Sequence, residues 1–278
     1  MIIDSHHHFW NYTNEDYGWI DNSMSRIRRD FLPSDMKETI QAAGVDGVIS
    51  VQARQSLEET DWLLELSEEN EFILGVTGWL PLINKNIETY ISQYTSHEKL
   101  KAVRHVIHDE PDDDFILRKD FNQGVSRLLQ HNLVYEILIF EKHLPQTISF
   151  VDQHPEQIFV LDHIGKPRIK ENILSPWREN MAELAKRDNV FCKMSGMVTE
   201  ADFKRWTPSQ LQPYSEVLID LFGAGRLMFG SDWPVCLVAI EYDQWLSTVK
   251  DFITQLSKSE QELILGGNAQ KVYGLSEQ

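Results

Sequence analysis

Histidines near the start of the chain offer the first chemistry in this sequence. His6 and His8 stand two positions apart, close behind a short apolar run. Residues i and i+2 of a strand face the same way, so both imidazoles would point together while His7 points away. Converging imidazoles suit a divalent cation or a polarised carbonyl. The pair alone is a weak motif, and its meaning depends on what lies at other strand ends.

Two later residues also follow short apolar runs. His163 comes after one run, and Asp232 follows another through a Gly-Ser pair. A carboxylate in that position can ligate a metal or take a proton from water. Each residue has a structural alternative, because His163 could cap a loop and Asp232 could begin a helix. All four residues fall at expected strand ends, and we therefore predict that they share one active site.

The elements that must position these residues alternate along the chain. Short β-branched or aromatic runs predict strands at residues 1–5, 47–52, 72–79, 102–107, 133–140, 158–162, 190–194 and 227–230. Amphipathic stretches predict helices at residues 33–43, 57–69, 121–130, 144–153, 176–186 and 211–222. Consecutive apolar residues in several runs indicate strands buried on both faces, as in a parallel sheet covered by helices.

This alternation predicts an α/β fold, a (β/α)8 TIM barrel, in one domain spanning residues 1–278. Functional side chains of such barrels come from the C-terminal ends of the strands. An open doubly wound sheet fits less well, because no Gly-rich phosphate fingerprint follows the first strand. The interruptions at residues 11–30, 108–114 and 198–212 are expected to be loops or short lids over one end of the barrel.

Composition narrows the range of partners and locations. Lys and Arg number 26 against 43 Asp and Glu, a net charge of −17, which disfavours nucleic acid and membrane surfaces. No apolar stretch reaches the roughly 18 residues of a membrane span, and the N-terminus does not resemble a signal peptide. Cys192 and Cys236 are too few for a disulfide scaffold. We expect a cytoplasmic protein, and a homodimer is compatible with the sequence.

Several motifs recur in a recognisable order along nearly the whole chain. They are Asp4-x-His6-x-His8-Phe9-Trp10, Gly78-Trp79, Val103-Arg104-His105, Leu161-Asp162-His163-Ile164-Gly165-Lys166-Pro167, Cys192-Lys193-Met194-Ser195-Gly196, Thr199-Glu200-Ala201-Asp202 and Gly230-Ser231-Asp232-Trp233-Pro234. Together they resemble the amidohydrolase superfamily, in the amidohydrolase-related branch that includes sugar lactonases. The resemblance implies a hydrolase of sugar-acid metabolism that opens lactones of deoxy-sugar acids, such as fuconolactone or rhamnonolactone.

The resemblance also bears on metal content. Two-metal members of the superfamily bridge their ions with a carboxylated lysine or a glutamate from a middle strand. Lys101 sits too early for that role, and the expected fifth strand carries no histidine. One divalent ion, such as Zn²⁺, on His6, His8 and Asp232 is compatible with the sequence. Members of this branch can also work without a tightly held metal, and no organic cofactor is expected.

Lactone hydrolysis needs an activated water, a polarised carbonyl and a proton for the leaving oxygen. We expect Asp232 to take the proton from water and later to return it to the ring oxygen. His6, His8 and His163 would stabilise the oxyanion with or without a cation. A zinc-dependent decarboxylase resembling the aminocarboxymuconate enzyme is the nearest alternative, since it uses a similar residue set. A non-catalytic binding barrel is the third, and the four intact residues argue against it.

Aromatic and polar residues at the same strand ends are candidates for binding the sugar. The expected platforms are Trp10, Trp79 and Trp233, and the expected hydrogen-bonding residues are Gln52, Arg104, His105 and Lys166. Core packing is the alternative for the tryptophans, and we expect it for at least one of them. Arg104 is the firmest choice, because a buried arginine needs a partner, which could also be Glu136 or Asp162.

Overall fold

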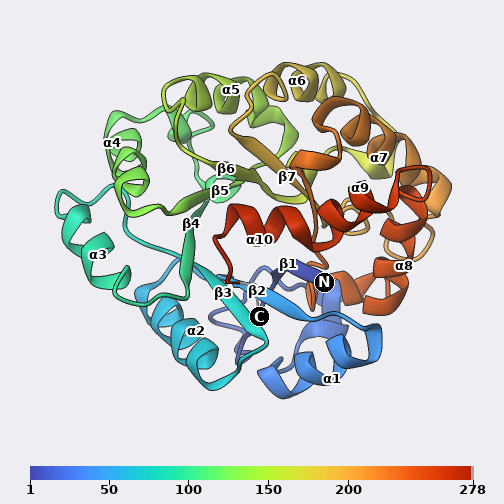
Figure 1. The fold of residues 1–278 in the computed structure, drawn as a ribbon, viewed down its shortest axis with the longest axis horizontal. Coiled ribbons are helices and arrows are strands. Elements are labelled where there is room, and N and C mark those ends of the chain that lie inside the picture. Colours follow the sequence, from blue (N-terminus) through green and yellow to red (C-terminus); the bar gives the residue numbers. More distant parts are fainter. Residues whose placement is uncertain (277–278) are drawn as a thin grey trace.

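Eight parallel strands form a nearly closed barrel in the computed structural model, which describes residues 1–276 (Figure 1). Neighbours in the sheet follow sequence order, as β1 Ile3–His7, β2 Gly47–Val51, β3 Ile73–Gly78, β4 Leu100–Val106, β5 Val134–Leu138, β6 Phe159–Leu161, β7 Val190–Met194 and β8 Leu227–Phe229. The segment after β8 completes the ring, since Asp232 N donates to His6 O at 2.8 Å and His8 N donates to Trp233 O at 2.7 Å. The predicted (β/α)8 barrel is confirmed.

Helices surround the barrel within the described residues. The outer ring consists of α1 Pro33–Ala43, α2 Leu57–Glu69, α3 Ile87–Tyr94, α4 Lys119–Leu128, α5 Leu144–Asp152, α6 Trp177–Leu184, α7 Pro208–Phe222 and α8 Tyr242–Phe252. Pro33 begins α1, and Gly44, with φ of 69°, ends it, which follows the usual preferences for these two residues. The Ser56 hydroxyl caps α2 by accepting from Glu59 N.

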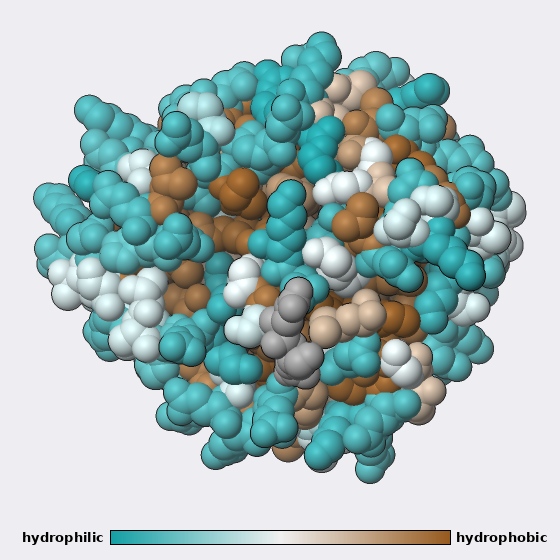
Figure 2. Space-filling view, in the orientation of Figure 1, coloured by the Kyte–Doolittle hydropathy of each residue, from teal (hydrophilic) through white to brown (hydrophobic). Residues whose placement is uncertain are grey.

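The C-terminal segment closes one end of the barrel. It comprises α9 Lys258–Glu262, a π-helical turn Leu263–Gly267 and α10 Asn268–Val272, which crosses the barrel mouth in Figure 1. Ala269 and Tyr273 pack on residues at the starts of the strands, such as Ile3 and Val134. The N-terminal end of the barrel is therefore plugged, and hydrophilic residues cover most of this face (Figure 2).

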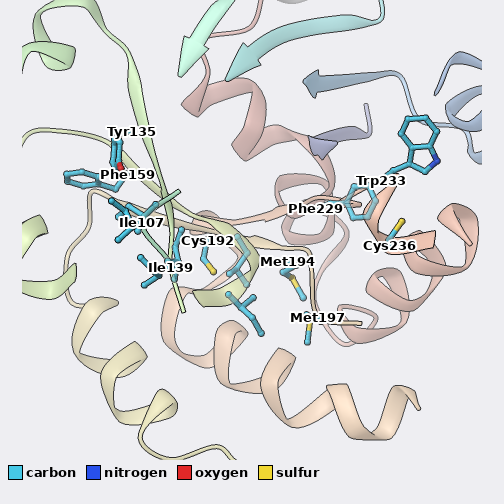
Figure 3. Packing of buried hydrophobic residues seen from close by; sticks show 14 of the residues in the cluster. Ile107, Tyr135, Ile139, Phe159, Cys192, Met194, Met197, Phe229, Trp233 and Cys236 are labelled. Atoms are coloured by element: carbon cyan, nitrogen blue, oxygen red, sulfur yellow. The ribbon is translucent and has the colours of Figure 1, made fainter. Parts of the chain in front are cut away.

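The main hydrophobic core lies between the strands and the surrounding helices. Tyr135 on β5 and Phe159 on β6 lie side by side in Figure 3, with ring centroids 6.2 Å apart. Both rings contact Phe150 of α5, at 5.9 and 5.3 Å between centroids. Outward-facing strand residues thus anchor the helices, which leaves the inward and C-terminal positions for polar chemistry. No helix among residues 1–276 is long and apolar enough to cross a membrane.

Several predicted boundaries were wrong. β1 runs to His7 rather than ending at Ser5, because His7 pairs with Ser50 of β2 and bridges to Trp233. The expected loop at 198–212 includes the start of α7 at residue 208. Helices α3, α8, α9 and α10 were not predicted. For α8 the signal was present, since its buried residues Tyr242, Trp245, Leu246 and Val249 follow helical spacing.

Candidate active site

The four predicted catalytic residues converge at the C-terminal end of the barrel. His6 lies on β1, and His8 is the first residue after that strand. His163 and Asp232 lie in the turns after β6 and β8. His6 Nε2 is 3.2 Å from His8 Nε2. Asp232 Oδ1 lies 3.4 Å from Nε2 of His8, 3.8 Å from that of His6 and 3.9 Å from that of His163. Three imidazoles therefore surround one carboxylate oxygen, and all four residues are buried.

Unusual backbone conformations aim two of these side chains. His163 has φ of 50° and Asp232 has φ of 58°, in the left-handed region that disfavours residues with a Cβ by about 1–2 kcal/mol. Strain of this kind is typical of functional sites. Gly196, with φ of 63°, makes room for the first of them, because a Cβ there would lie 2.6 Å from His163 Cγ.

Asp4 links the first strand of the barrel to the turn after the last strand, beneath the site. Its Oδ1 accepts hydrogen bonds from Ser231 N at 2.8 Å and His6 N at 3.1 Å, and Tyr242 OH donates to its Oδ2 at 3.1 Å. Burial raises the pKa of the Asp4 carboxyl to about 6, against the hydrogen bonds that lower it. This residue therefore fixes the distance between the first strand and the turn that carries Asp232.

Hydrogen bonds to Nδ1 orient the three imidazoles. His8 Nδ1 is 2.8 Å from Val51 O, His163 Nδ1 is 2.9 Å from Ser195 Oγ, and His6 Nδ1 is 3.2 Å from Lys193 Nζ. A backbone carbonyl can only accept, so His8 carries its proton on Nδ1 and presents the Nε2 lone pair to the site. Burial lowers the pKa of His6 and of His163 well below the usual range, so both rings are neutral at pH 7.

These donor atoms fit a divalent cation. The ligand atoms of His6, His8 and Asp232 all lie within 4.8 Å of one another. Tetrahedral zinc with bonds of about 2.0–2.2 Å separates its ligands by roughly 3.3–3.6 Å. The Lys193 ammonium can only donate, so His6 Nδ1 accepts from it and the His6 proton lies on Nε2, facing the Nε2 lone pair of His8 across 3.2 Å. A divalent cation held by both nitrogens would take the place of this proton.

A buried charged network lies directly below. Lys193 Nζ contacts Glu136 Oε2 at 2.7 Å, Asp162 Oδ1 at 3.1 Å and His6 Nδ1 at 3.2 Å. Arg104 Nη1 donates to Asp162 Oδ2 at 2.8 Å, and its Nη2 donates to Gln52 O. Two cations thus balance two carboxylates inside the barrel.

The network perturbs its carboxyl groups in opposite directions. Burial raises the pKa of Glu136, although Lys193 opposes the shift. Burial alone would raise the pKa of Asp162 as well, but Lys193, His6 and Arg104 together hold it well below the usual range. Sequence reasoning noted Lys193 only as part of a motif, whereas a lysine inside an apolar strand was itself a signal for a buried ionic role.

A cavity of about 190 Å³ opens above the four central residues. It is lined by His8, Trp19, Ala53, Arg104, Val106, His108, Asp109, Leu138, His163, Lys166, Asp232 and Val235. Of the predicted binding residues, Arg104 and Lys166 reach it, and Lys166 Nζ also pairs with Glu200 Oε1 at 2.7 Å. Sequence reasoning missed Trp19, His108 and Asp109, which lie in segments that it had assigned only to loops or lids.

Three other predicted binding residues support the wall without lining the cavity. Gln52 is fully buried and its amide donates to Arg104 O at 3.4 Å. Trp79 Nε1 donates to His105 Nδ1 at 3.3 Å, and His105 Nε2 in turn bonds Glu110 Oε1 at 2.6 Å. The structure therefore places these polar groups against protein partners rather than in the cavity.

Trp10 and Trp233 do not line this cavity, and both pack in the hydrophobic core. Trp10 is fully buried, with its ring stacked on His8 at 6.4 Å between centroids and its Nε1 donating to Arg29 O. Trp233 packs on Phe31 at 5.1 Å and lies among buried hydrophobic residues in Figure 3. The left-handed turn at Asp232 directs that carboxylate inward and the next side chain outward.

A parallel barrel that brings together His6 and His8 from the end of its first strand, a histidine after the sixth and an aspartate after the eighth is the arrangement that the sequence resemblance implies. The chain belongs to the amidohydrolase family, whose model, described as Amidohydrolase, matches residues 3–275.

Known proteins similar to this chain include two lactonases. It is 40% identical to an L-fucono-1,5-lactonase of Burkholderia multivorans, with 100% of this chain and 97% of that protein covered. It is 32% identical to an L-fucono-1,5-lactonase of Burkholderia ambifaria, with coverages of 98% and 94%. A crystal structure of a Burkholderia multivorans amidohydrolase with bound zinc has a TM-score of 0.95 and 39% identity, over 99% of this chain and 100% of that one. Decarboxylases are only 13–14% identical and share the fold alone.

Proposed function

We propose that this protein hydrolyses the lactone of a deoxy-sugar acid. Asp232 activates the attacking water, a proton on Nε2 of His163 polarises the acyl carbonyl, and His6 and His8 offer nitrogen donors for a divalent ion. The observation that carries this proposal is the Asp232 carboxylate at the cavity floor, within 3.9 Å of three imidazole nitrogens. The similarity to two lactonases over nearly the whole chain supports the same reaction class.

The three histidines have different roles in this proposal. The proton of His8 is held by Val51 O, so its Nε2 acts as an electron-pair donor. The Ser195 hydroxyl can donate to Nδ1 of His163, which leaves a proton on Nε2 for the carbonyl oxygen of the substrate. Removing one such oxyanion contact typically lowers the rate about 10²–10³-fold.

His6, His8 and Asp232 are the residues that would hold a divalent ion, and zinc suits this set of nitrogen and oxygen donors. Such an ion supplies Lewis-acid polarisation of the carbonyl when bound. The protein's own groups perform the remaining steps: Asp232 accepts the water proton, and Arg104 places a fixed positive charge in the cavity wall. The carboxylate is needed in either case.

The size and polarity of the cavity favour one sugar ring with an apolar substituent. Its volume of about 190 Å³ lies below the roughly 300–1,000 Å³ of pockets for drug-sized ligands. Arg104, His108 and Lys166 provide a polar wall. The apolar part of the lining is formed by Trp19, Ala53, Val106, Leu138 and Val235. A 6-deoxy sugar offers hydroxyls to the polar side chains of this lining and a methyl group to the apolar ones.

Acid release from a panel of aldonolactones tests this function. L-Fuconolactone and L-galactonolactone form the sharpest pair, because they differ only by the hydroxyl on carbon 6. Burying that hydroxyl without a partner costs about 1–3 kcal/mol, so we expect kcat/KM to favour the deoxy substrate roughly 5–150-fold. A panel without any hydrolysed lactone would refute the function, and equal rates for the pair would refute the role of the apolar lining residues.

A zinc-dependent decarboxylase remains the sequence-based alternative, but no feature of the cavity favours it. Such an enzyme requires its metal, so lactone hydrolysis by chelator-treated, metal-free protein would exclude it. We also propose that the described barrel is a single domain and that the protein acts in the cytoplasm, where the buried, unpaired Cys192 and Cys236 stay reduced. A homodimer remains a prediction.

A further inference from the structure

A histidine–aspartate pair stands at the rim of the cavity, in the turn Ile107–Asp109 that follows β4. His108 and Asp109 both line the cavity, and His108 Nδ1 is 2.9 Å from Asp109 Oδ1. β4 and β8 are separated by four steps in the eight-stranded ring, so this pair faces Asp232 from the opposite wall. Neither residue has a role in the water activation described above.

Asp109 and Phe140 fix the orientation of the His108 ring. The hydrogen bond from His108 lowers the pKa of Asp109, so the latter is a carboxylate at neutral pH and accepts the Nδ1 proton. The Phe140 ring lies against the imidazole, with centroids 4.5 Å apart. Nε2 is then the nitrogen available to a ligand.

Other charged groups share this space. Arg104 enters from β4, Lys166 from the turn after β6 and Asp232 from the turn after β8, while His163 occupies the cavity floor. Two cations and two carboxylates, Asp109 and Asp232, therefore surround His108. Histidine is the side chain that most often serves as a general acid.

We propose that His108 is the general acid that protonates the leaving ring oxygen, an inference that rests on the lactonase function proposed above. Asp232 removes a proton from water as the water oxygen bonds to the carbonyl carbon, and the carbonyl π electrons move to oxygen. When the carbonyl reforms, the bond between carbon and ring oxygen breaks. The departing oxygen keeps that electron pair and takes the proton from His108 Nε2. Solvent then reprotonates His108 and deprotonates Asp232.

This assignment replaces the return of the proton by Asp232. Oδ1 of that carboxylate lies within 3.9 Å of three histidines on its own side of the cavity. When Asp232 is the base and His108 is the acid, the base lies on the side of the attacking water and the acid lies on the opposite wall. His108 is thus a catalytic residue, and Asp109 is a positioning residue.

Replacement of the ring oxygen by sulfur provides the test. A thiolate is much less basic than a sugar alkoxide and leaves without a proton, so a thiolactone of the same sugar acid does not need the acid. We expect His108→Gln to lower kcat for the oxygen lactone by roughly 10²–10⁴-fold. The fall for the thiolactone should be less than about tenfold, which is below the ordinary range for a general acid. Asp109→Asn should show a smaller loss with the same selectivity.

His131→Gln is the matched control, because His131 is also partly buried and paired with a carboxylate, Glu88 at 2.9 Å, but lies outside this cavity. It should leave both rates unchanged. Equal losses on the two substrates in His108→Gln, or an unchanged kcat for the oxygen lactone, would overturn the general-acid role while leaving the lactonase function standing. Failure of the wild-type protein to hydrolyse either substrate would instead refute the function itself.

The pH profile gives a second readout. In the wild type, kcat for the oxygen lactone should fall at high pH as the acid loses its proton, and this limb should be absent from His108→Gln. A high-pH limb that persists unchanged in the variant would contradict the proposal. Circular dichroism of both variants checks that the fold is retained.

Discussion

The buried ammonium of Lys193 offers the sharpest test of how the barrel interior holds the site. Its Nζ lies 2.7 Å from Glu136 Oε2 and 3.1 Å from Asp162 Oδ1, with no solvent exposure of any of these side chains. Lys193→Met keeps most of the side-chain volume and removes the charge. The remaining Arg104 then faces two carboxylates, so one buried negative charge is left without a cation.

Removing one partner of a buried ion pair destabilises a protein by about 3–5 kcal/mol. We expect the lower end, about 3 kcal/mol, because Glu136 still accepts hydrogen bonds from Thr77 Oγ1 at 2.8 Å and Tyr273 OH at 2.6 Å. Glu136→Gln in the same chain restores the charge balance between Arg104 and Asp162. The double variant should therefore recover about 2 kcal/mol of the loss.

The loss of stability in Lys193→Met should also depend on pH. Burial already raises the pKa of Glu136, and loss of the neighbouring ammonium raises it further. A carboxyl group whose pKa is higher in the folded than in the unfolded state loses stability as pH rises, and regains it as pH falls. The difference between Lys193→Met and the wild type should therefore narrow from pH 8 to pH 5.5.

Equilibrium urea unfolding, followed by circular dichroism, measures these free energies. Lys186→Met is the matched control, since Lys186 is exposed and pairs only with Glu183 within the described residues, and it should change stability by less than about 0.5 kcal/mol. A deficit below about 1 kcal/mol, the size of an ordinary substitution, would refute the ionic account of the interior. So would a double variant no more stable than Lys193→Met.

Two further substitutions test local features. Gly196→Ala places a Cβ 2.6 Å from His163 Cγ at a φ of 63°. We therefore expect a lower melting temperature and a kcat reduced by roughly 10²-fold. A kcat close to that of the wild type would contradict the role of this glycine. Burial raises the pKa of Glu59 from 4.5 to about 7, so the wild type should lose stability as pH rises through this interval. Glu59→Gln keeps an acceptor for Ala53 N and Arg54 N. In thermal unfolding, the stability of this variant relative to the wild type should increase from pH 4.5 to pH 8. Melting temperatures that change with pH in parallel in the two proteins would rule out this titration.

Residue spacing predicts the barrel and the convergence of His6, His8, His163 and Asp232, because parallel strands bring their C-terminal ends together. The period of two along β1 correctly separates His6 from His7, whose Nε2 bonds Ser50 Oγ instead. The alternation of side-chain directions holds only within a strand and does not extend into the turns that follow. The direction of Trp233 depends on the left-handed backbone at Asp232, which spacing does not encode.

Other parts of the site depend on contacts that are distant in sequence. Lys193 finds its partners on β5 and in the turn after β6, and no local pattern indicates which carboxylates they are. His108 belongs to a turn beside the cavity, and its ring packs on Phe140, which is distant in sequence. Loop conformation, rather than strand order, therefore determines which residues line the substrate cavity.

Asp232→Asn tests the central claim most directly, because the amide keeps the shape of the side chain and removes the base. We expect kcat for the preferred lactone to fall by at least about 10²-fold, within the range of general base catalysis. Circular dichroism and the melting temperature should stay close to those of the wild type. A correctly folded Asp232→Asn protein with near-normal lactone hydrolysis would contradict the assignment of Asp232 as the group that activates water.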